Sequence, residues 1–421
     1  MKFLAPLIFV WFTQQLLAEN WPGYRGPTGM GVVEGDAELP LTWNAETGEN
    51  ILWKTPLPLG EDSPDHNQSS PIVHGDRVFV TTAAWAPGDD PKSTQPTHHV
   101  SCFGLMDGEL IWDRVVEPGP WTLGDLRGGY AAPTPATNGK LVFATFGSSI
   151  IHALDFSGEV VWSREIPDHA QFDVALASGP IVFEDTVILL TDRKPPKSAI
   201  QAFDATTGEI RWSRKREETS FGHVTPVLAE IDGRQQLLVS ATNALEGLDP
   251  KTGEVIWFSK WARSIWPVAS PVMTEGLIYC MGGRGGHPGL IVDPRDAKGE
   301  IAPKFQLGPA AEGLGSPVAF GDLVFRMNKP GVLRCVRLTT GEELFEERLE
   351  GVDPGVSPVV TADGRIYIAS AGKTLVLRAA GEFEVLAESD LADGSLASPA
   401  VVDGKLILKG KQFLWCVGSK P

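Results

Sequence analysis

The feature that most constrains this chain is a unit that recurs along most of its 421 residues, with starts 41 to 46 residues apart after the first interval. Each unit begins with a proline and apolar residues, turns through glycine or aspartate, and continues as a run rich in Val, Ile and Phe. Repeats of this length build architectures in which one supersecondary unit stacks on the next, because a single unit cannot bury its apolar face alone. The eight units start at Pro71, Pro135, Pro180, Pro226, Pro271, Pro317, Pro358 and Pro399.

A second motif recurs with the unit: a tight turn, then Gly-Glu, with an aromatic residue three positions after the glutamate, as in residues 108–112. Short runs of β-branched and aromatic residues favour strands, and Asp-Gly or Asn-Gly pairs favour tight hairpins. No amphipathic helical pattern separates the runs, so each unit is predicted to be a four-stranded antiparallel blade. Further copies of the motif start at Gly158, Gly208, Gly253 and Gly341, and degenerate copies at Gly299 and Gly381.

The two ends of the chain complement each other. The last unit, residues 398–417, has the proline start and an apolar strand but ends before a Gly-Glu strand. The missing strand is present at the other end, in residues 48–53. We therefore predict an all-β fold, an eight-bladed β-propeller whose last blade is closed by the N-terminal strand, because ring closure removes exposed sheet edges. The predicted propeller covers residues 48–421, and residues 19–47 form an N-terminal extension.

The first residues predict export. Lys2 precedes an apolar stretch from Phe3 to Phe12, and Ala18 supplies a small residue at a cleavage point. This is the layout of a secretory signal peptide over residues 1–18, which would deliver the protein to the periplasm or outside the cell. The apolar stretch is short for a membrane span, so an uncleaved anchor is the weaker alternative. No later segment is predicted to cross a membrane.

The charge of the chain limits its partners. The 53 acidic residues outnumber the 36 basic ones, and the net charge is -17. Such a surface repels nucleic acid phosphates and anionic lipid head groups. We therefore expect no nucleic acid partner. The expected partners are an envelope or extracellular protein or a small polar ligand, and the ring is expected to be a monomer.

The recurring tryptophans and cysteines are interpreted as packing residues. The tryptophans are expected to fill the wedge between neighbouring blades, since they recur with the repeat. The four cysteines lack the spacing of a zinc site or a redox pair, and a disulfide pairing is not indicated. Cys102, Cys335 and Cys416 share one repeat position, which favours a small buried side chain. The predicted packing tryptophans are Trp53, Trp112, Trp162, Trp212 and Trp257.

The N-terminal motif and the blade motif together support a family resemblance. The opening Trp-Pro-Gly-Tyr-Arg-Gly-Pro at residues 21–27 is followed by Leu-Pro-Leu-Thr-Trp at residues 39–43. This opening resembles secreted proteins with pyrrolo-quinoline quinone (PQQ)-like repeats. The blade motif resembles the quinoprotein alcohol dehydrogenases and the outer-membrane assembly lipoprotein BamB. The resemblance covers essentially the whole chain after residue 18 and implies a fold more than an activity.

Two kinds of function follow from this resemblance. The enzymes of the family hold PQQ with Ca²⁺ on the propeller face, with a vicinal Cys-Cys disulfide, a stacking Trp, a Glu/Asn/Asp metal set and a catalytic Asp. This chain has no adjacent cysteines and no candidate catalytic residue or metal set. We therefore expect an exported, non-enzymatic binding or scaffold propeller without a cofactor. The alternatives are a PQQ- and Ca²⁺-dependent dehydrogenase or cofactor binder, and a carbohydrate-binding propeller that uses Trp266 and Tyr130.

The candidate binding residues lie in loops of one face. The loops that lead into the proline starts, and those between the middle strands of each blade, gather at one end of the central channel. Their polar residues predict a locally basic funnel for a small anionic or polyhydroxylated ligand, although surface loops are often polar without function. The pair His98-His99 is expected in a solvated loop. The candidate funnel residues are His66, Asn67, Arg127, Tyr130, His169, Asp173, His223, Arg263, Trp266, Arg284, His287 and Asn328.

Overall fold

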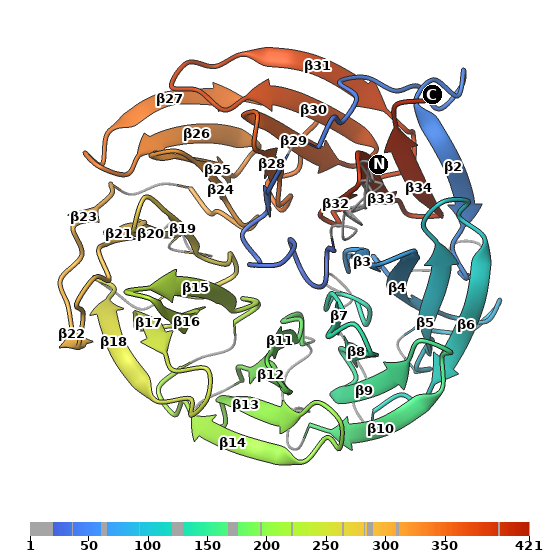
Figure 1. Ribbon diagram of the computed structural model, residues 1–421, viewed down its shortest axis with the longest axis horizontal. Coiled ribbons are helices and arrows are strands. Elements are labelled where there is room, and N and C mark those ends of the chain that lie inside the picture. The colour runs from blue at the N-terminus through green and yellow to red at the C-terminus, as the bar shows by residue number, and fades with distance from the viewer. Residues whose placement is uncertain are drawn as a thin grey trace, which may run out of the picture.

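The computed structural model describes residues 20–35, 37–59, 65–91, 93–119, 129–166, 176–193, 196–219, 222–262, 265–281, 283, 289–308, 311–394 and 396–420. Within these residues every regular element is a strand, and the strands form eight sheets arranged as blades around a ring (Figure 1). The prediction of an all-β, eight-bladed propeller is confirmed. The described part of the chain contains no helix long and apolar enough to span a bilayer.

Each blade runs from an inner strand at the channel to an outer strand at the rim. Blade 1 contains β3 (Ile72–His74), β4 (Arg77–Ala84), β5 (Thr97–Gly104) and β6 (Leu110–Val116). Blade 2 contains β7 (Ala136–Thr137), β8 (Leu141–Phe146), β9 (Ile150–Asp155) and β10 (Val160–Glu165). Blade 3 contains β11 (Ile181–Phe183), β12 (Thr186–Thr191), β13 (Ala199–Asp204) and β14 (Ile210–Lys215). Blade 4 contains β15 (Val227–Ile231), β16 (Arg234–Ser240), β17 (Ala244–Leu248) and β18 (Val255–Lys260).

The remaining blades follow the same order. Blade 5 contains β19 (Val272–Thr274), β20 (Leu277–Cys280), β21 (Leu290–Val292) and β23 (Phe305–Gln306). Blade 6 contains β24 (Val318–Phe320), β25 (Leu323–Asn328), β26 (Val332–Arg337) and β27 (Glu343–Arg348). Blade 7 contains β28 (Val359–Thr361), β29 (Arg365–Ser370), β30 (Lys373–Arg378) and β31 (Val385–Asp390). Blade 8 contains β32 (Ala400–Val402), β33 (Lys405–Lys409), β34 (Phe413–Gly418) and β2 (Ile51–Pro56). The short strand β22 (Gly299–Glu300) is added to the outer edge of blade 4.

Blade 8 is composite, as the complementary ends of the sequence predicted. The N-terminal strand β2 pairs antiparallel with the C-terminal strand β34, and Trp53 lies opposite Cys416. In Figure 1 the blue β2 lies beside the red β34 at the rim. Pairing the two ends joins the first blade to the last and satisfies backbone groups that would otherwise form an open edge.

Tryptophans of the outer strands reach from one blade to the next. Four indoles pack near the turn that precedes the next outer strand, and each donates its Nε1–H to a carbonyl there. The pairs are Trp53 to Leu105, Trp112 to Phe156, Trp162 to Ala205 and Trp212 to Pro250. Trp257 is fully buried and donates to Gln236 within its own blade, at 2.8 Å.

The strand register explains the position that the cysteines share. Cys102 lies opposite Trp112, Cys335 opposite Phe345, and Cys416 opposite Trp53. The residue across from the aromatic ring must be small because a large side chain would collide with it. All four cysteines are buried free thiols, as predicted from the sequence.

A belt of hydroxyl groups joins the inner strands around the channel. In most units the residue before the starting proline is Ser or Thr, and hydrogen bonds connect it to the same position in the neighbouring blade. In the third unit this position is Gly179, whose Cβ would lie 2.5 Å from the Thr134 carbonyl oxygen, so a glycine is required. The bonded pairs are Ser70–Thr134, Gly179–Thr225, Thr225–Ser270, Ser270–Ser316, Ser316–Ser357, Ser357–Ser398 and Ser398–Ser70.

The segment before β2 crosses the middle of the ring (Figure 1). It begins with a backbone bridge between Trp21 and Val73 and continues to β1 (Val32–Val33), which pairs parallel with β28. Between these points Arg25 is fully buried and donates Nη2–H bonds to the carbonyls of Met30, Pro317 and Pro358. The sequence motif of residues 21–27 therefore ties the N-terminal segment to blades 6 and 7 from inside the channel.

Candidate functional site

The structure places only part of the predicted funnel. Six of the candidate residues lie outside the described residues, and their placement stays a prediction: Arg127, His169, Asp173, Arg263, Arg284 and His287. Of the others, Asn67, Tyr130 and Asn328 are buried, His223 is half-buried, and His66 and Trp266 are exposed. The three buried residues are bonded to the protein itself, and the ligand-binding role of the set stays a prediction.

Asn67 and Tyr130 belong to a buried cluster where blades 8, 1 and 2 meet. The Asp65 carboxylate accepts hydrogen bonds from the backbone N–H groups of Asn67 and Tyr130. The Lys409 ammonium at the end of β33 donates to the carbonyls of Asn67 and Thr81, at 2.8 and 2.9 Å. Polar groups buried without water require such partners, so these residues hold the ring closed at this junction.

Burial shifts the titration of both charged groups in this cluster. It raises the pKa of the Asp65 carboxyl to about 6, although the bonds from Asn67 and Tyr130 and the charge of Lys409 oppose the shift. Burial also lowers the pKa of the Lys409 ammonium to about 7, against the attraction of Asp65. Perturbed pairs occur at functional sites, but they also occur in structural ion networks such as this one.

The other predicted residues have structural surroundings of their own. Asn328, at the end of β25, donates its side-chain amide to the Ala311 carbonyl at 2.6 Å. The His223 backbone N–H donates to the Pro267 carbonyl, which links two blade entrances. Trp266 next to it is 49% exposed.

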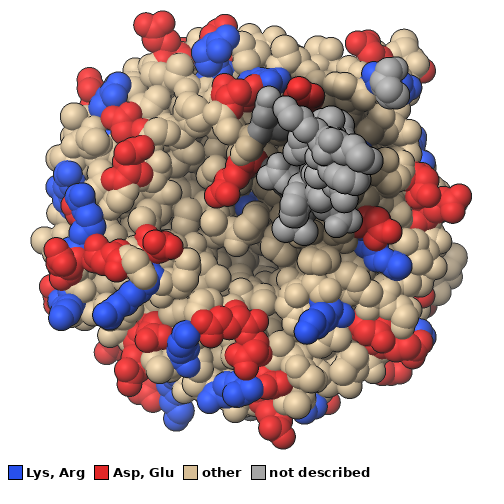
Figure 2. All heavy atoms as spheres, in the orientation of Figure 1, with Lys and Arg blue, Asp and Glu red and all other residues tan. Residues whose placement is uncertain are grey.

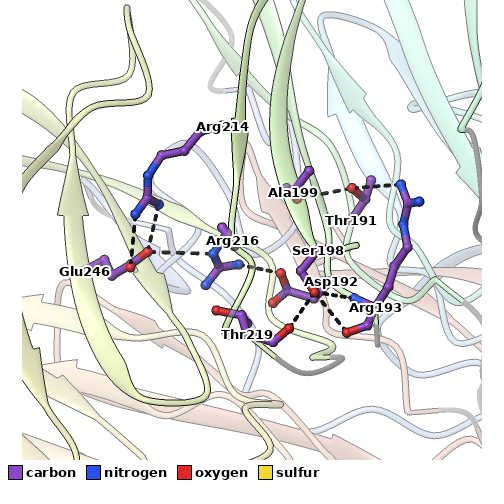
Figure 3. Close-up of polar contacts among 9 residues, drawn as sticks. All are labelled: Thr191, Asp192, Arg193, Ser198, Ala199, Arg214, Arg216, Thr219 and Glu246. Atoms are coloured by element: carbon purple, nitrogen blue, oxygen red, sulfur yellow. Dashed lines mark hydrogen bonds and ion pairs between the residues drawn. The ribbon is translucent and has the colours of Figure 1, made fainter. Parts of the chain in front are cut away.

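A second charged network lies between blades 3 and 4 (Figure 3). Arg216 and Asp192 form an ion pair of 2.6 Å, and neither side chain is more than 1% exposed. Arg216 also lies 3.7 Å from Glu246, which in turn accepts two hydrogen bonds from Arg214. Burial raises the pKa of the Asp192 carboxyl to about 6, while the charge of Arg216 lowers it. Sequence reasoning did not identify this network, because its members come from separate strands without a local motif.

The outer end of this network opens into a groove of about 350 Å³. The groove is lined by polar and apolar side chains of both blades, including Arg214, Asn243, Glu246, Phe258 and Lys260. Most of its charges are already paired: Arg214 with Glu246, and Lys260 with Glu300 at 2.8 Å. The groove therefore offers shape and mixed polarity rather than a strong field of one sign.

The expectation that His98 and His99 lie in a solvated loop was wrong. Both are in strand β5, and His98 is completely buried between the rings of Tyr130 and Phe146. His98 bonds to Ser148 at 2.8 Å, and burial lowers its pKa to about 3. The β-rich surroundings of blade 1 outweighed the polar loop composition on which the prediction rested.

The rim of blades 1 to 3 presents apolar side chains to solvent. They occupy the two positions between the glutamate and the tryptophan of the repeat motif, or lie further along the same outer strand. In blade 7 Val385 is similarly exposed, at 46%. Figure 2 shows charged side chains of both signs along the periphery of the face in view. The exposed residues are Leu110 (49%), Ile111 (47%), Val115 (54%), Val160 (42%), Val161 (48%) and Ile210 (56%).

Two parts of the donor set that the resemblance implies for PQQ and Ca²⁺ can be compared with this chain. The four cysteines are spread over four blades, so no vicinal disulfide exists in this chain. Within the described ranges, no three His, Cys, Asp or Glu side chains converge as metal ligands. Whether the chain binds the quinone stays a prediction.

Taken together, the proline starts, the Gly-Glu-x-x-Trp outer strands and the composite last blade define an eight-bladed propeller of the PQQ-repeat type. A family profile described as "Outer membrane protein assembly factor BamB" matches residues 96–345, more than half of the chain. The chain belongs to this family. No curated protein sequence matches the chain.

Solved structures show the same fold. BamB from Moraxella catarrhalis is 15% identical, with a TM-score of 0.63, and the match covers 88% of this chain and 97% of BamB. The quinohemoprotein alcohol dehydrogenase from Comamonas testosteroni is 14% identical, with a TM-score of 0.65, over 96% of this chain and 81% of the enzyme. The computationally designed protein Ika8 is 11% identical, with a TM-score of 0.57, over 86% and 99%. At these identities the likeness shows the fold and leaves the activity to the residues of each site.

Proposed function

We propose that this protein is a non-enzymatic scaffold of the cell envelope, which binds a partner protein on the outer strands of blades 1 to 3. The expected signal peptide over residues 1–18 would export it to the periplasm or beyond. The fold is shared by a BamB and by an alcohol dehydrogenase, so the proposal depends on the surface of this chain.

The observation that carries the proposal is the row of exposed aliphatic residues on the rim. Leu110 and Ile111 in blade 1, and Val160 and Val161 in blade 2, occupy the same repeat positions in neighbouring blades, and each is 42–49% exposed. Apolar side chains gathered on a surface, with polar residues around them, are typical of protein interaction sites. A partner that covered them would gain about 25 cal/mol for each Å² of apolar surface removed from water.

The name of the matching family supports the same conclusion. That family is described as an assembly factor for outer membrane proteins. A rigid ring with an apolar rim suits an assembly role, because it can hold an unfolded or incomplete partner without changing shape.

A retention assay with immobilised protein tests this proposal. The bait lacks residues 1–18 and is incubated with periplasmic extract, and bound proteins are cross-linked and identified by mass spectrometry. The double variant Ile111→Ser/Val161→Ser should lower retention of the specific partner about tenfold, since roughly 1.4 kcal/mol of apolar contact is lost. The control variant Val385→Ser removes an equally exposed aliphatic residue from blade 7 and should retain the partner fully. Equal retention by all three proteins would refute the proposal.

A titration distinguishes this proposal from the quinoprotein alternative. PQQ with Ca²⁺ is added to the same protein, and quenching of its tryptophan fluorescence is followed. A scaffold without cofactor gives no saturable quenching in the micromolar range. Saturable quenching would contradict the proposal and favour a cofactor binder.

A further inference from the structure

The outer edge of blade 4 shows what can bind to the rim of this propeller. Its outer strand β18 pairs in parallel with β22, with Trp257 opposite Gly299 and Phe258 opposite Glu300. The Ile301 N–H donates to the Phe258 carbonyl at 2.9 Å, and Lys260 forms an ion pair of 2.8 Å with Glu300. The chain thus adds a fifth strand to one of its own blades.

One of the two aliphatic residues of the motif packs with the residues that flank this added strand. In blade 4 the two aliphatic residues are Val255 and Ile256, and both are half-buried. Ile256 packs on the same apolar cluster as Ala297 and Ile301, which flank β22. In blade 1 the equivalent residues Leu110 and Ile111 are 49% and 47% exposed. The exposed Ile111 of blade 1 therefore corresponds to Ile256, which packs with the residues that flank the added strand of blade 4. Val255 packs instead on a separate cluster with Trp212 and Leu228.

The backbone edge of blade 1 is available in the same register. Strand β6 is the outermost strand of its sheet among the described residues. The two blades can be aligned on their tryptophans, since Trp112 lies opposite Cys102 and Trp257 lies opposite Gly247. In this alignment Asp113 of blade 1 is equivalent to Phe258 of blade 4. Unpaired strand edges are templates for a further strand from another chain.

Blade 2 is less suited to the same interaction. Its residue at the Phe258 position is Ser163, and the guanidinium of Arg164 donates to the Ser163 carbonyl at 2.8 Å. The Nε–H of Arg164 also donates to the Gly208 carbonyl at 3.0 Å, as that of Arg114 in blade 1 does to Gly158 at 2.7 Å, but the guanidinium of Arg114 pairs with the Glu159 carboxylate. The arginine of blade 2 thus occupies the acceptor that would receive a partner strand, and blade 1 is the better site.

We propose that the outer edge of blade 1 binds an extended segment of the partner protein as a parallel fifth strand. This inference rests on the proposed scaffold function and names its mode of binding. Val115 of blade 1, which is 54% exposed, is equivalent to Lys260 of blade 4. Lys260 pairs with Glu300 of β22, so we expect the partner segment to have an aliphatic residue at the position of Glu300. The net charge of -17 favours a neutral or basic segment over an acidic one.

A labelled peptide tests the inference directly. The probe has the sequence of residues 296–304 with Glu300→Val, and its fluorescence anisotropy is measured against the protein. We expect saturable binding, which Ile111→Glu weakens about tenfold or more because a charge replaces an apolar contact. The control Met106→Glu adds the same charge at a 70% exposed position in the preceding turn and should leave binding unchanged. No binding at ~1 mM peptide, an affinity of about -4 kcal/mol, would overturn the inference.

Hydrogen exchange separates this inference from the scaffold proposal. The protein is examined with the partner from the retention assay, and amide exchange in residues 110–116 is followed. A paired edge slows the exchange of β6, whereas Ile111→Glu abolishes the effect. If the partner is retained but β6 exchanges as in the free protein, strand addition is wrong and the scaffold stands. If no partner is retained, the scaffold proposal itself fails.

Discussion

Replacing Trp162 with alanine tests how neighbouring blades hold each other. Trp162 is 6% exposed, its ring packs on the turn of Gly208 in the next blade, and its Nε1–H donates to the Ala205 carbonyl at 3.0 Å. Deleting such a buried ring costs about 3–5 kcal/mol of unfolding free energy. With an unfolding entropy of about 2.1 cal/mol/K per residue, a chain of about 400 residues loses about 4–6 °C in Tm.

A second substitution makes the prediction specific to the contact between blades. A Cβ at Gly208 would lie 2.6 Å from the Cδ2 atom of Trp162, and the φ of Gly208 is +69°. Gly208→Ala alone therefore costs about 1–2 kcal/mol for the left-handed backbone, and the collision adds to this. In Trp162→Ala the ring is absent and only the backbone cost remains. The double-mutant cycle should show a coupling of at least about 1 kcal/mol.

The assay is urea denaturation followed by circular dichroism, together with calorimetry for Tm. The matched control is Trp266→Ala, since Trp266 is 49% exposed and its loss should cost no more than about 0.5 kcal/mol. The reasoning is refuted if the effects of Trp162→Ala and Gly208→Ala simply add. It is equally refuted if Trp162→Ala destabilises no more than Trp266→Ala.

Three further predictions concern the channel and blade 1. Thr225→Val leaves the N–H of Gly179 without its acceptor and should cost about 1–3 kcal/mol, measured by urea denaturation; an unchanged midpoint would count against the hydroxyl belt. Arg25→Met removes the donor to three carbonyls, so limited proteolysis should cleave the N-terminal segment about tenfold faster. A cleavage rate equal to that of the parent protein would contradict the anchoring role. Burial lowers the pKa of His98 to about 3 and that of His152 to about 4, so below pH 6.5 the unfolded chain holds more protons than the folded one. Stability should therefore fall between pH 6.5 and 4 by roughly 1.4 kcal/mol per pH unit for each histidine, and His98→Phe should flatten this profile; parallel profiles would disprove the argument.

The candidate site was predicted less completely than the fold. Polar loop composition selected Asn67 and Tyr130 as ligand-facing, but both are buried around Asp65 and Lys409. A polar residue needs either water or a hydrogen-bond partner within the protein. Composition alone does not show which of these the residue has in the folded protein. The exposed pair Leu110 and Ile111 carried a signal in the sequence, since two adjacent aliphatic residues precede Trp112 on an outer strand.

The sequence by itself determined the strands, the blade number and the closure of the ring. These depend on local patterns that repeat: the proline starts, the Gly-Glu turns, and the strand of residues 51–56 that the last unit lacks. A short-range pattern specifies a strand or turn because the backbone preferences act within a few residues.

Tertiary structure alone decided which distant groups meet. Arg25 reaches the carbonyls of Pro317 and Pro358, about 300 residues away, only because the ring brings blades 6 and 7 around the N-terminal segment. The ion pair of Arg216 with Asp192, and the pairing of β22 with blade 4, likewise join groups whose meeting no local pattern predicted. Such contacts follow from the curvature and closure of the whole ring, which no local pattern encodes.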